Sequence, residues 1–332
     1  YDQMRLTRFQ ILFWCRDLIW SFGNWKSEEL KSYIDDIDPD IIFAPIYDKT
    51  YGNRMVEFVQ KYSKKPMVGY IWDDVYSLKQ FSLSPLYWID RLIKRHYIRK
   101  AVSCCKYLYV ISDKQKREYT KLLNTECRLL YKGNHFGGEP KAKKNISKPL
   151  HLVYMGNIAF GRWKALVEIV KALKIINKNE VKADLSIYTL SPRSKKMNRK
   201  LNVEGISQVM PVVPPEEVET IHRNADVLVH VEPMNLKDML SYRLSFSTKI
   251  VDYFHSSRCI LAFGGRGTAT MEYLKDHDAA LVINKKCEIV PTLKRIIENP
   301  EILNEYSVKA WKCGKKNHQL REIQKKLMTD FR

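Results

Sequence analysis

The order in which strand-like and helix-like segments follow one another is the feature that most constrains this fold. Short apolar segments rich in β-branched residues alternate with amphipathic helical segments over residues 41–123, and again over 151–298. Such alternation is typical of parallel sheets that helices cover on both faces. Between the two runs, residues 131–149 are rich in Gly, Pro and Lys. The sequence therefore predicts an α/β protein of two doubly wound, Rossmann-like domains that face a central cleft.

The length of 332 residues suits two such domains. We expect an N-terminal domain over residues 1–140, a C-terminal domain over 150–312, and a final helix over 313–332 that packs back on the first domain. The aromatic-rich segment 9–20 is expected to be buried. Since the chain begins at Tyr1 in what resembles the middle of a domain, the first domain is expected to lack its natural start.

The charge of the chain is concentrated in its middle part. The net charge is +20, and residues 51–200 hold 32 Lys and Arg against 11 Asp and Glu. A localised excess indicates one region that meets an anion, such as nucleic acid, an anionic membrane or a phosphorylated substrate. No apolar run approaches the ~20 residues that span a bilayer. Seven cysteines without C-x-x-C spacing favour a reducing, cytoplasmic location.

A polar run that leads into an amphipathic helix, residues 242–254, is the most informative motif. The free N–H groups at a helix start suit a phosphate, and Ser247, Thr248 and Lys249 would add hydroxyl donors and a positive charge. Asp252 lies one turn further along, within reach of ribose hydroxyls. An ordinary helix with a Ser/Thr cap is the alternative interpretation.

A second candidate phosphate site lies in residues 154–166. A predicted strand ends at Gly156, and a short loop with Gly161, Arg162 and Lys164 leads into a helix. The segment is neither G-x-G-x-x-G nor a P-loop, which argues against dinucleotide binding and NTPase activity. A plain strand-to-helix turn with a solvated Arg is the alternative.

Three stretches together resemble the donor-binding domain of the GT-B glycosyltransferases, in particular the retaining family 4. They are LVYMGN…GRWKALVEIVKAL, VMPVVPPEEVETIHRNADVLVHVEP and FSTKIVDYFHSSRCILAFGG. The resemblance covers residues 150–300 closely and 38–137 loosely, and STKIVDY is its most specific part. It implies that 150–312 binds a nucleotide-sugar donor and that 1–140 lies on the acceptor side.

The resemblance also implies roles for individual residues. Lys249 would hold the donor diphosphate, Arg162 stands where many members have a phosphate-binding Lys, and Asp252 matches the ribose-binding Glu. The remaining donor-binding candidates near these residues are Gly156, Asn157, Lys164, Phe246, Ser247 and Thr248, and Val212 and Val213 belong to a separate loop that would lie beside the nucleobase. Two departures stand out. Asn157 replaces an Arg, so one phosphate-binding cation is either missing or supplied by Lys164. Leu244 replaces the first acid of the E-x7-E pair.

Two features of the first half bear on its function. Asp73 and Asp74 follow the predicted strand 67–72, and one of them is expected to contact the donor sugar as a catalytic group, unless they only cap the next segment. The helix 85–102 is basic and aromatic, which suits an anionic membrane surface, unless it is a core-packed helix with a solvated basic face. Its membrane-surface candidates are Trp88, Arg91, Lys94, Arg95 and Arg99.

The predicted function is a glycosyltransferase that moves a sugar from a nucleotide-diphosphate donor, with a UDP-sugar as the expected donor, to a glycan or lipid-linked glycan in surface polysaccharide synthesis. Retention of stereochemistry is implied by the resemblance alone. The nucleotide-sugar is a substrate, so no cofactor is expected, and the absence of a suitable D-x-D, H-E-x-x-H or Cys/His cluster predicts metal independence. The expected location is cytoplasmic, peripheral at the inner membrane face, without nucleic acid as a partner.

Three alternatives stay open at this point. One is a nucleotide-sugar 2-epimerase of the same fold, although no set of acids and His suited to proton transfer is evident. Another is a basic nucleic-acid-binding protein, although no signature of such a module accompanies the charge. The third is an inactive relative that serves as a partner subunit, which Leu244 in place of an acid keeps open.

Overall fold

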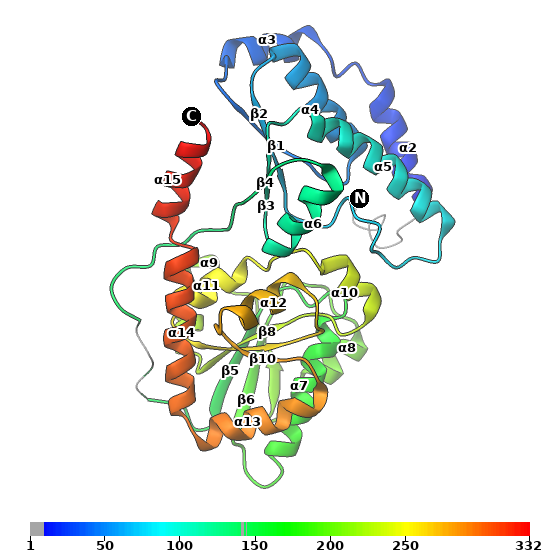
Figure 1. The fold of residues 1–332 in the computed structure, drawn as a ribbon. Helices are drawn as coiled ribbons and strands as arrows, with labels where there is room; N and C mark the ends of the chain where they lie inside the picture. Colours follow the sequence, from blue (N-terminus) through cyan, green and yellow to red (C-terminus); the bar gives the residue numbers. More distant parts are fainter. Residues whose placement is uncertain (1–9, 141–142, 144) are drawn as a thin grey trace. The chain divides into compact units, whose positions relative to one another are not determined.

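The computed structural model describes residues 10–140, 143 and 145–332, and it divides the chain into two compact units (Figure 1). Unit 1 comprises Tyr1–Leu130 with Phe331, and unit 2 comprises Tyr131–Asp330 with Arg332. Each unit contains one sheet, and every strand pair in both sheets is parallel. The prediction of two α/β domains with parallel sheets is therefore confirmed.

Unit 1 contains a four-stranded sheet in the order β1-β2-β3-β4. Because each strand pairs with the next one along the chain, the helices between them carry the chain in one direction across the sheet. The elements in chain order are α2 (Gln10–Phe22), α3 (Glu28–Ile37), β1 (Ile42–Pro45), α4 (Thr50–Ser63), β2 (Met67–Ile71), α5 (Pro85–Ser103), β3 (Leu108–Val110), α6 (Asp113–Leu123) and β4 (Cys127–Leu129).

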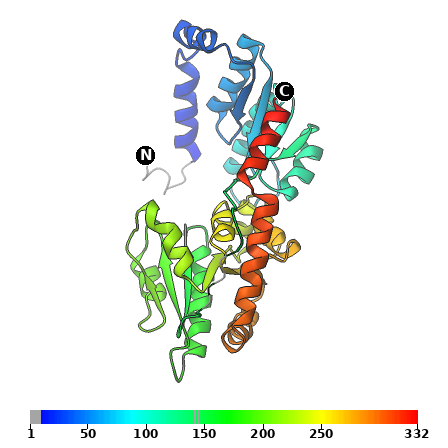
Figure 2. The same cartoon turned by 90° about the vertical axis from the view of Figure 1, so that its left-hand side faces the viewer.

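Helix α2 corrects one expectation. The aromatic-rich segment 9–20 was expected to be buried, but residues 10–22 form a helix that packs on α4 and α5 rather than on the sheet (Figure 2). Ile19 and Phe22 are 72% and 82% exposed. A helix in an outer layer buries only one stripe, so the remaining aromatic and aliphatic side chains stay at the surface. Residue 9 lies outside the described residues.

Unit 2 contains a six-stranded sheet in the order β10-β9-β8-β5-β6-β7. The strands are β5 (Leu150–Met155), β6 (Ala183–Tyr188), β7 (Ser207–Val209), β8 (Val227–Val231), β9 (Cys259–Phe263) and β10 (Leu281–Ile283). The helices are α7 (Arg162–Ile176), α8 (Lys195–Leu201), α9 (Pro215–Asn224), α10 (Leu236–Tyr242), α11 (Lys249–His255), α12 (Ala269–Asp276), the 3₁₀ helix η1 (Lys286–Glu288), α13 (Ile289–Glu298), α14 (Glu301–Asn317) and α15 (Leu320–Asp330).

The strand order of unit 2 reverses at β5, which pairs with β6 on one side and with β8 on the other. The chain therefore leaves the carboxyl ends of β5 and β8 in opposite directions and opens a crevice between them. In open α/β sheets this reversal is where ligands bind. The topology thus directs the search for a site to the residues that follow Met155 and Val231.

The segment 131–136 belongs structurally to unit 2. The ring of Tyr131 lies 5.5 Å from that of Phe246, and Phe136 is buried with its ring 6.3 Å from that of Trp311. The units therefore divide ahead of Tyr131 rather than at 140. No helix in the described part of the chain is long and apolar enough to cross a bilayer.

Candidate functional site

Three segments of unit 2 meet at the crevice beside β5 and β8. Gly156 directly follows β5, Glu232 follows β8, and Lys249 begins α11. The first turn of α7 adds Arg162. Within the described residues, these groups share ring and charge contacts with the buried Tyr154, so they form one cluster, here called the Lys249 cluster.

Lys249 is held over aromatic rings. Its Nζ lies 4.3 Å from the ring centre of Tyr154 and 5.9 Å from that of Tyr253, and it donates to the carbonyl oxygen of Met155 at 3.5 Å. Burial, followed by the nearby positive charge of Arg162, lowers the pKa of Lys249 to about 7, while Glu232 opposes the shift. A ligand that brings negative charge would favour the protonated form of this buried amine and would therefore bind to it favourably.

Gly156 makes room for the Lys249 ammonium. A Cβ at this position would lie 3.0 Å from Nζ of Lys249, and the backbone has φ +151°, which L side chains rarely adopt. A glycine at the end of β5 therefore lets the main chain and the amine come close together. The backbone N–H of Gly156 donates to Tyr188 O at 2.9 Å, which ties the turn to β6.

Arg162 is oriented by a buried carboxylate. Its Nη2 lies 3.1 Å from Oε2 of Glu232, and its guanidinium lies 4.7 Å from the ring centre of Tyr242. Helix α7 can start at Arg162 because Gly161, with φ +80°, ends the preceding loop. This arrangement fixes the direction of the guanidinium before any ligand arrives.

His230 is the second neighbour of the Glu232 carboxylate, beside Arg162. Its Nε2 lies 3.1 Å from Oε1 of Glu232, and burial lowers the pKa of His230 to about 4. The imidazole is therefore neutral, and its Nε2–H donates to the carboxylate. Burial raises the pKa of Glu232, but His230 and Arg162 outweigh it and hold that pKa well below its usual range. Glu232 is thus a charged group shared between two neighbours.

Asp252, the predicted ribose ligand, forms an ion pair with Lys132. Nζ of Lys132 lies 2.6 Å and 2.7 Å from the two carboxylate oxygens. Both side chains are partly exposed, so the carboxylate remains accessible from one side. Lys132 comes from the segment that follows β4, so the link ties this part of the chain to α11.

The approach to α11 offers less to a ligand than its sequence suggests. Phe246 is buried, with its ring stacked on that of His318, and the N–H of Ser247 donates to Oγ1 of Thr270 at 3.0 Å. Thr248 is exposed and makes no side-chain cap. Of the predicted phosphate ligands in this run, the Lys249 side chain is therefore the one that lies in the cluster.

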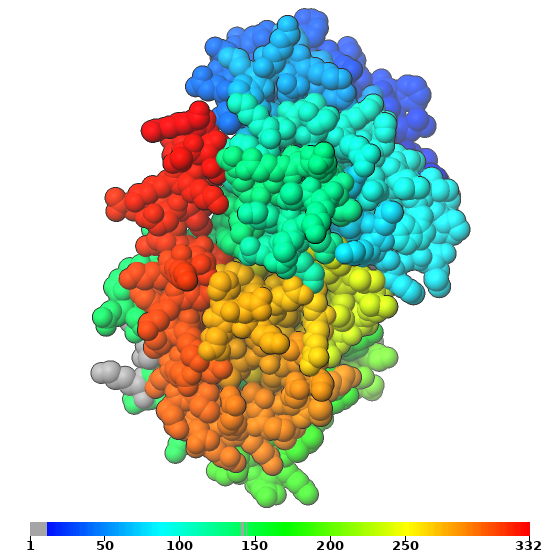
Figure 3. Space-filling model, viewed as in Figure 1, coloured from blue at the N-terminus to red at the C-terminus, as the bar shows by residue number. Residues whose placement is uncertain are grey.

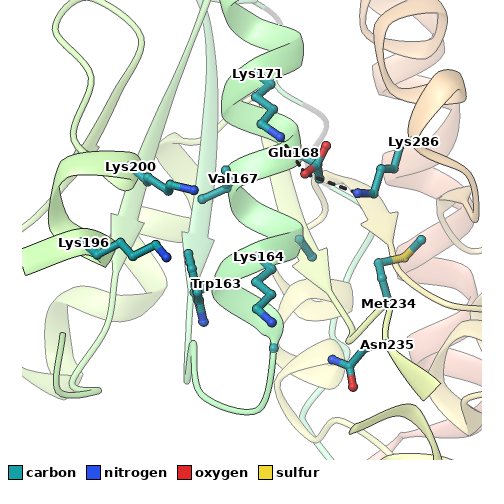
Figure 4. A pocket seen from close by; sticks show the side chains of 12 residues that line it. Trp163, Lys164, Val167, Glu168, Lys171, Lys196, Lys200, Met234, Asn235 and Lys286 are labelled. Carbon is teal, nitrogen blue, oxygen red and sulfur yellow. Dashed lines mark hydrogen bonds and ion pairs between the residues drawn. The ribbon is translucent and has the colours of Figure 1, made fainter. Parts of the chain in front are cut away.

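The other predicted donor residues lie at varied places in unit 2. Asn157 accepts from the N–H of Ala159 at 2.7 Å and so shapes its own loop. Val212 is exposed in the loop after β7, and Val213 is partly exposed beside it. Lys164 lines a separate pocket (Figure 4). Leu244, where the resemblance would place an acid, is fully buried.

The two candidate catalytic acids of unit 1 have different surroundings. Asp74 is buried and accepts from Ser77 Oγ at 2.5 Å, from Tyr119 OH at 3.2 Å and from the N–H of Ser77. This network holds the turn after β2. Asp73 has an exposed side chain at the carboxyl end of the same strand. Asp73 therefore remains the more accessible of the two candidates.

The basic residues of α5 are directed mainly at the protein rather than forming a free positive stripe. Arg91 is buried and donates to Ser77 O at 2.7 Å, and Arg95 donates to Tyr76 O. The remaining candidates are engaged as well: Lys94 with Asp90, Arg99 with Tyr76 OH, and the Trp88 indole with Ser82 O. The amphipathic helix is confirmed, but helical spacing could not reveal these partners, all but Asp90 of which lie in the segment that follows β2.

Sequence reasoning missed four members of the site: Glu232, His230, Tyr154 and Lys132. Glu232 carried a usable signal, because it directly follows a predicted buried strand at the edge where parallel sheets place their ligands. No sequence signal indicated Tyr154 or His230, because both residues lie within apolar, buried strands. Lys132 lies in the Gly-, Pro- and Lys-rich segment between the two predicted domains, where no ligand-binding residue was expected.

Comparison with known proteins gives a consistent result for the fold. No protein-family model and no curated protein sequence matches the chain. Among solved structures, sucrose-phosphate synthase from Thermosynechococcus elongatus matches with a TM-score of 0.68 at 13% identity, over 91% of this chain and 75% of that one. Anabaena Alr3699/HepE, in complex with UDP and glucose, matches with a TM-score of 0.64 at 10% identity, over 90% and 80%.

Some matching structures are considerably longer than this chain. TarM matches with a TM-score of 0.66 at 12% identity over 91% of this chain, but the match covers only 57% of TarM. All these likenesses lie far below the identity at which function transfers, so they establish architecture. The protein has the GT-B glycosyltransferase fold, with two Rossmann-like units.

Proposed function

We propose that the protein is a glycosyltransferase that uses a nucleotide-diphosphate sugar, with UDP as the nucleotide. The observation that carries the proposal is the pairing of Lys249 and Arg162 at the strand-order reversal of unit 2. Two similar structures hold UDP with a sugar, namely HepE with glucose and the pneumococcal O-GlcNAc transferase GtfA with GlcNAc. The fold and the cationic cluster favour the same ligand class.

The chemistry follows from where charge develops. The bond between the anomeric carbon and the β-phosphate oxygen breaks, and its electron pair leaves with UDP. A bond from the acceptor hydroxyl oxygen to the anomeric carbon forms, and the hydroxyl proton passes to the leaving phosphate or to solvent. Lys249 and Arg162 stabilise the negative charge that grows on the diphosphate, which lowers the barrier because this charge is largest late in the reaction.

The finer proposals rest on the family resemblance. We assign retention of anomeric stereochemistry, a family 4 relationship, and a glycan or lipid-linked glycan acceptor of surface polysaccharide synthesis to this protein. Asp252 would bind the ribose, and Asp73 is the accessible acid offered by unit 1. Determining the anomeric configuration of the product by NMR tests the stereochemistry directly, and an inverted product would contradict it.

A thermal-shift screen tests the donor proposal. UDP, GDP, dTDP and their sugars are added to the full chain, and UDP is expected to raise the unfolding temperature the most. Lys249→Ala is expected to lose this response, because it removes a cation from the Lys249 cluster. Lys174→Ala is the matched control, since Lys174 is an exposed lysine at the far end of α7. Equal responses of the two variants, or no nucleotide response at all, would refute the proposal.

The same preparations distinguish the alternative functions. A 2-epimerase would convert UDP-GlcNAc to its free epimer without any acceptor. A nucleic-acid-binding protein would bind DNA in a salt-dependent manner and more strongly than it binds UDP. Either result in place of sugar transfer would replace the proposed function.

Metal independence is part of the proposal because side chains already supply positive charge at the diphosphate position. We expect UDP affinity and sugar transfer to remain the same within about twofold after EDTA treatment. Transfer that disappears with EDTA and returns with Mg²⁺ or Mn²⁺ would show that a metal shares the role assigned to Lys249 and Arg162.

Peripheral contact with an anionic membrane rests on apolar rather than basic residues of unit 1. Helix α5 exposes Leu86, Ile89 and Ile93 at helical spacing, and Leu83 just before it is 89% exposed. Figure 3 shows this cyan segment at the surface. Residues 1–130 hold 22 Lys and Arg against 16 Asp and Glu, so an apolar face on a net positive unit suits an anionic bilayer.

Vesicle flotation tests the membrane contact. The wild-type chain is expected to float with vesicles that contain phosphatidylglycerol. The double variant Leu83→Asp, Ile89→Asp is expected to remain in the unbound fraction at the bottom of the gradient. Ile175→Asp is the control, because Ile175 is a 61% exposed apolar residue of unit 2. Flotation that the double variant leaves intact would exclude this face as the membrane contact.

A further inference from the structure

A pocket outside the Lys249 cluster gathers an unusual amount of positive charge. It has a volume of about 570 Å³ and lies between α7, α8, the start of α10 and η1 (Figure 4). Five lysines line it, together with a single acid, Glu168, and they are Lys164, Lys171, Lys196, Lys200 and Lys286. They come from three separate elements, so the cluster is a product of the fold rather than of one basic run.

Only part of this charge is balanced within the protein. Glu168 forms ion pairs with Lys171 at 2.9 Å and with Lys286 at 3.4 Å. Dashed lines mark these two pairs in Figure 4. Lys164, Lys196 and Lys200 have no carboxylate partner among the described residues. Like charges held around one hollow repel each other, and an anion with several charges relieves that repulsion.

The pocket also offers an aromatic surface. Trp163 is partly buried, with one side against the hydrophobic core of unit 2, and it lines the hollow together with Val167. In Figure 4, Lys196 and Lys200 extend from α8 toward the part of α7 that carries Trp163 and Val167. An indole beside ammonium groups suits a ligand that has an apolar ring face as well as anionic groups.

This pocket is separate from the candidate donor site. Neither Lys249 nor Arg162 lines it, and the Arg162 guanidinium is held by Glu232 and Tyr242 instead. Successive residues of the first turn of α7 therefore contribute to two different sites. Arg162 belongs to the Lys249 cluster, and Trp163 and Lys164 line the pocket.

We propose that this lysine pocket binds a phosphorylated sugar carrying two or more phosphate groups, as a second ligand beside the nucleotide-sugar. The sugar ring packs on Trp163, and the phosphates bind Lys164, Lys196 and Lys200. The binding is non-covalent and needs no event at the donor site. The proposal can therefore be tested independently of the proposed transferase activity.

Calorimetric titration with glucose 1,6-bisphosphate tests the proposal on the full chain, with saturating UDP present to occupy the donor site. One bound molecule per chain is expected. Lys196→Gln with Lys200→Gln is expected to weaken binding at least tenfold, and Trp163→Leu by about threefold to tenfold. Lys174→Gln with Lys178→Gln is the control, because it removes the same charge from exposed positions outside the pocket.

Three outcomes would overturn the proposal. They are absence of binding by the wild-type chain, equal affinity of the pocket and control variants, and inorganic pyrophosphate binding as tightly as the sugar bisphosphate. The last result would show that the ring makes no contribution. The UDP thermal shift is measured on every variant, and the pocket variants are expected to retain it. Absence of UDP binding by the wild-type chain would instead refute the donor proposal alone.

Discussion

Lys249 is the residue on which the proposed function depends most. Its amine lies beside Arg162, above Tyr154 and close to the Cβ-free side of Gly156. A cation pair held in this way is unfavourable in the free protein, because burial and the second positive charge both disfavour the protonated amine. A bound diphosphate would offset this unfavourable charge interaction, so the cluster favours the binding of a diphosphate.

The lowered pKa of Lys249 predicts proton uptake when UDP binds. At pH 8 the free amine, with a pKa of about 7, is mostly neutral, and the bound diphosphate raises that pKa and restores the proton. Glu232 and Arg162 stay charged throughout, so they do not contribute. UDP affinity should therefore fall by up to about tenfold per pH unit above pH 7.

Calorimetry in buffers of different ionisation enthalpy measures this uptake. We expect up to one proton taken up per UDP at pH 8, much less at pH 6, and none at pH 8 in Lys249→Ala. An affinity that stays constant from pH 6.5 to pH 9 would show that the amine is already protonated in the free protein.

Helix α5 shows how an element can carry a charge pattern for structural reasons. Its buried Arg91 donates to Ser77 O and to Asp74 O at 2.7 Å and 2.9 Å, and its Nη2 lies 3.5 Å from Oδ1 of Asp74. The helix thereby fastens the irregular segment that follows β2. This leaves its exposed aliphatic residues as the part of the helix available to a partner.

Removing this arginine is expected to destabilise unit 1. Arg91→Ala leaves Asp74 buried without its cation and two carbonyl groups without their donor, which costs about 3 kcal/mol in the free energy of unfolding. Urea denaturation followed by circular dichroism measures the change. Lys100→Ala, at an exposed position of the same helix, is the control and should change stability by less than about 0.5 kcal/mol. Equal effects of the two variants would argue against a structural role for Arg91.

At the scale of the whole molecule, unit 2 holds every residue predicted to bind the donor, together with the lysine pocket. The two candidate sites draw on neighbouring parts of α7, so binding data on the intact chain must tell them apart. The charge of +20 thus has at least two structural uses, at the Lys249 cluster and in the pocket.

Hydrogen exchange on the intact chain locates UDP among these regions. Slower exchange is expected in peptides that cover 155–162 and 246–252, because a bound diphosphate restrains both loops. Peptides that cover α8 are expected to stay unchanged. Protection confined to α8 and η1 would place the nucleotide in the lysine pocket instead of at the Lys249 cluster.

Local patterns in the sequence were enough to determine the architecture. Alternating strand and helix segments predict two parallel sheets, because the period of apolar residues and the glycines at strand ends act over short distances. The same local signals predicted Gly156 and Arg162 in a turn from strand to helix, and Lys249 in the first turn of a helix. They also identified α5 as an amphipathic helix.

Tertiary structure alone decided which side chains meet. The Glu232 pairing with Arg162, the Lys132 pairing with Asp252, and the network around Asp74 join residues that lie far apart in the chain. The lysine pocket likewise needs α7, α8 and η1 together. Charge and burial depend on distances in space, which a one-dimensional pattern does not encode, so the same basic residues serve as a structural clamp in α5 and as a candidate anion site in unit 2.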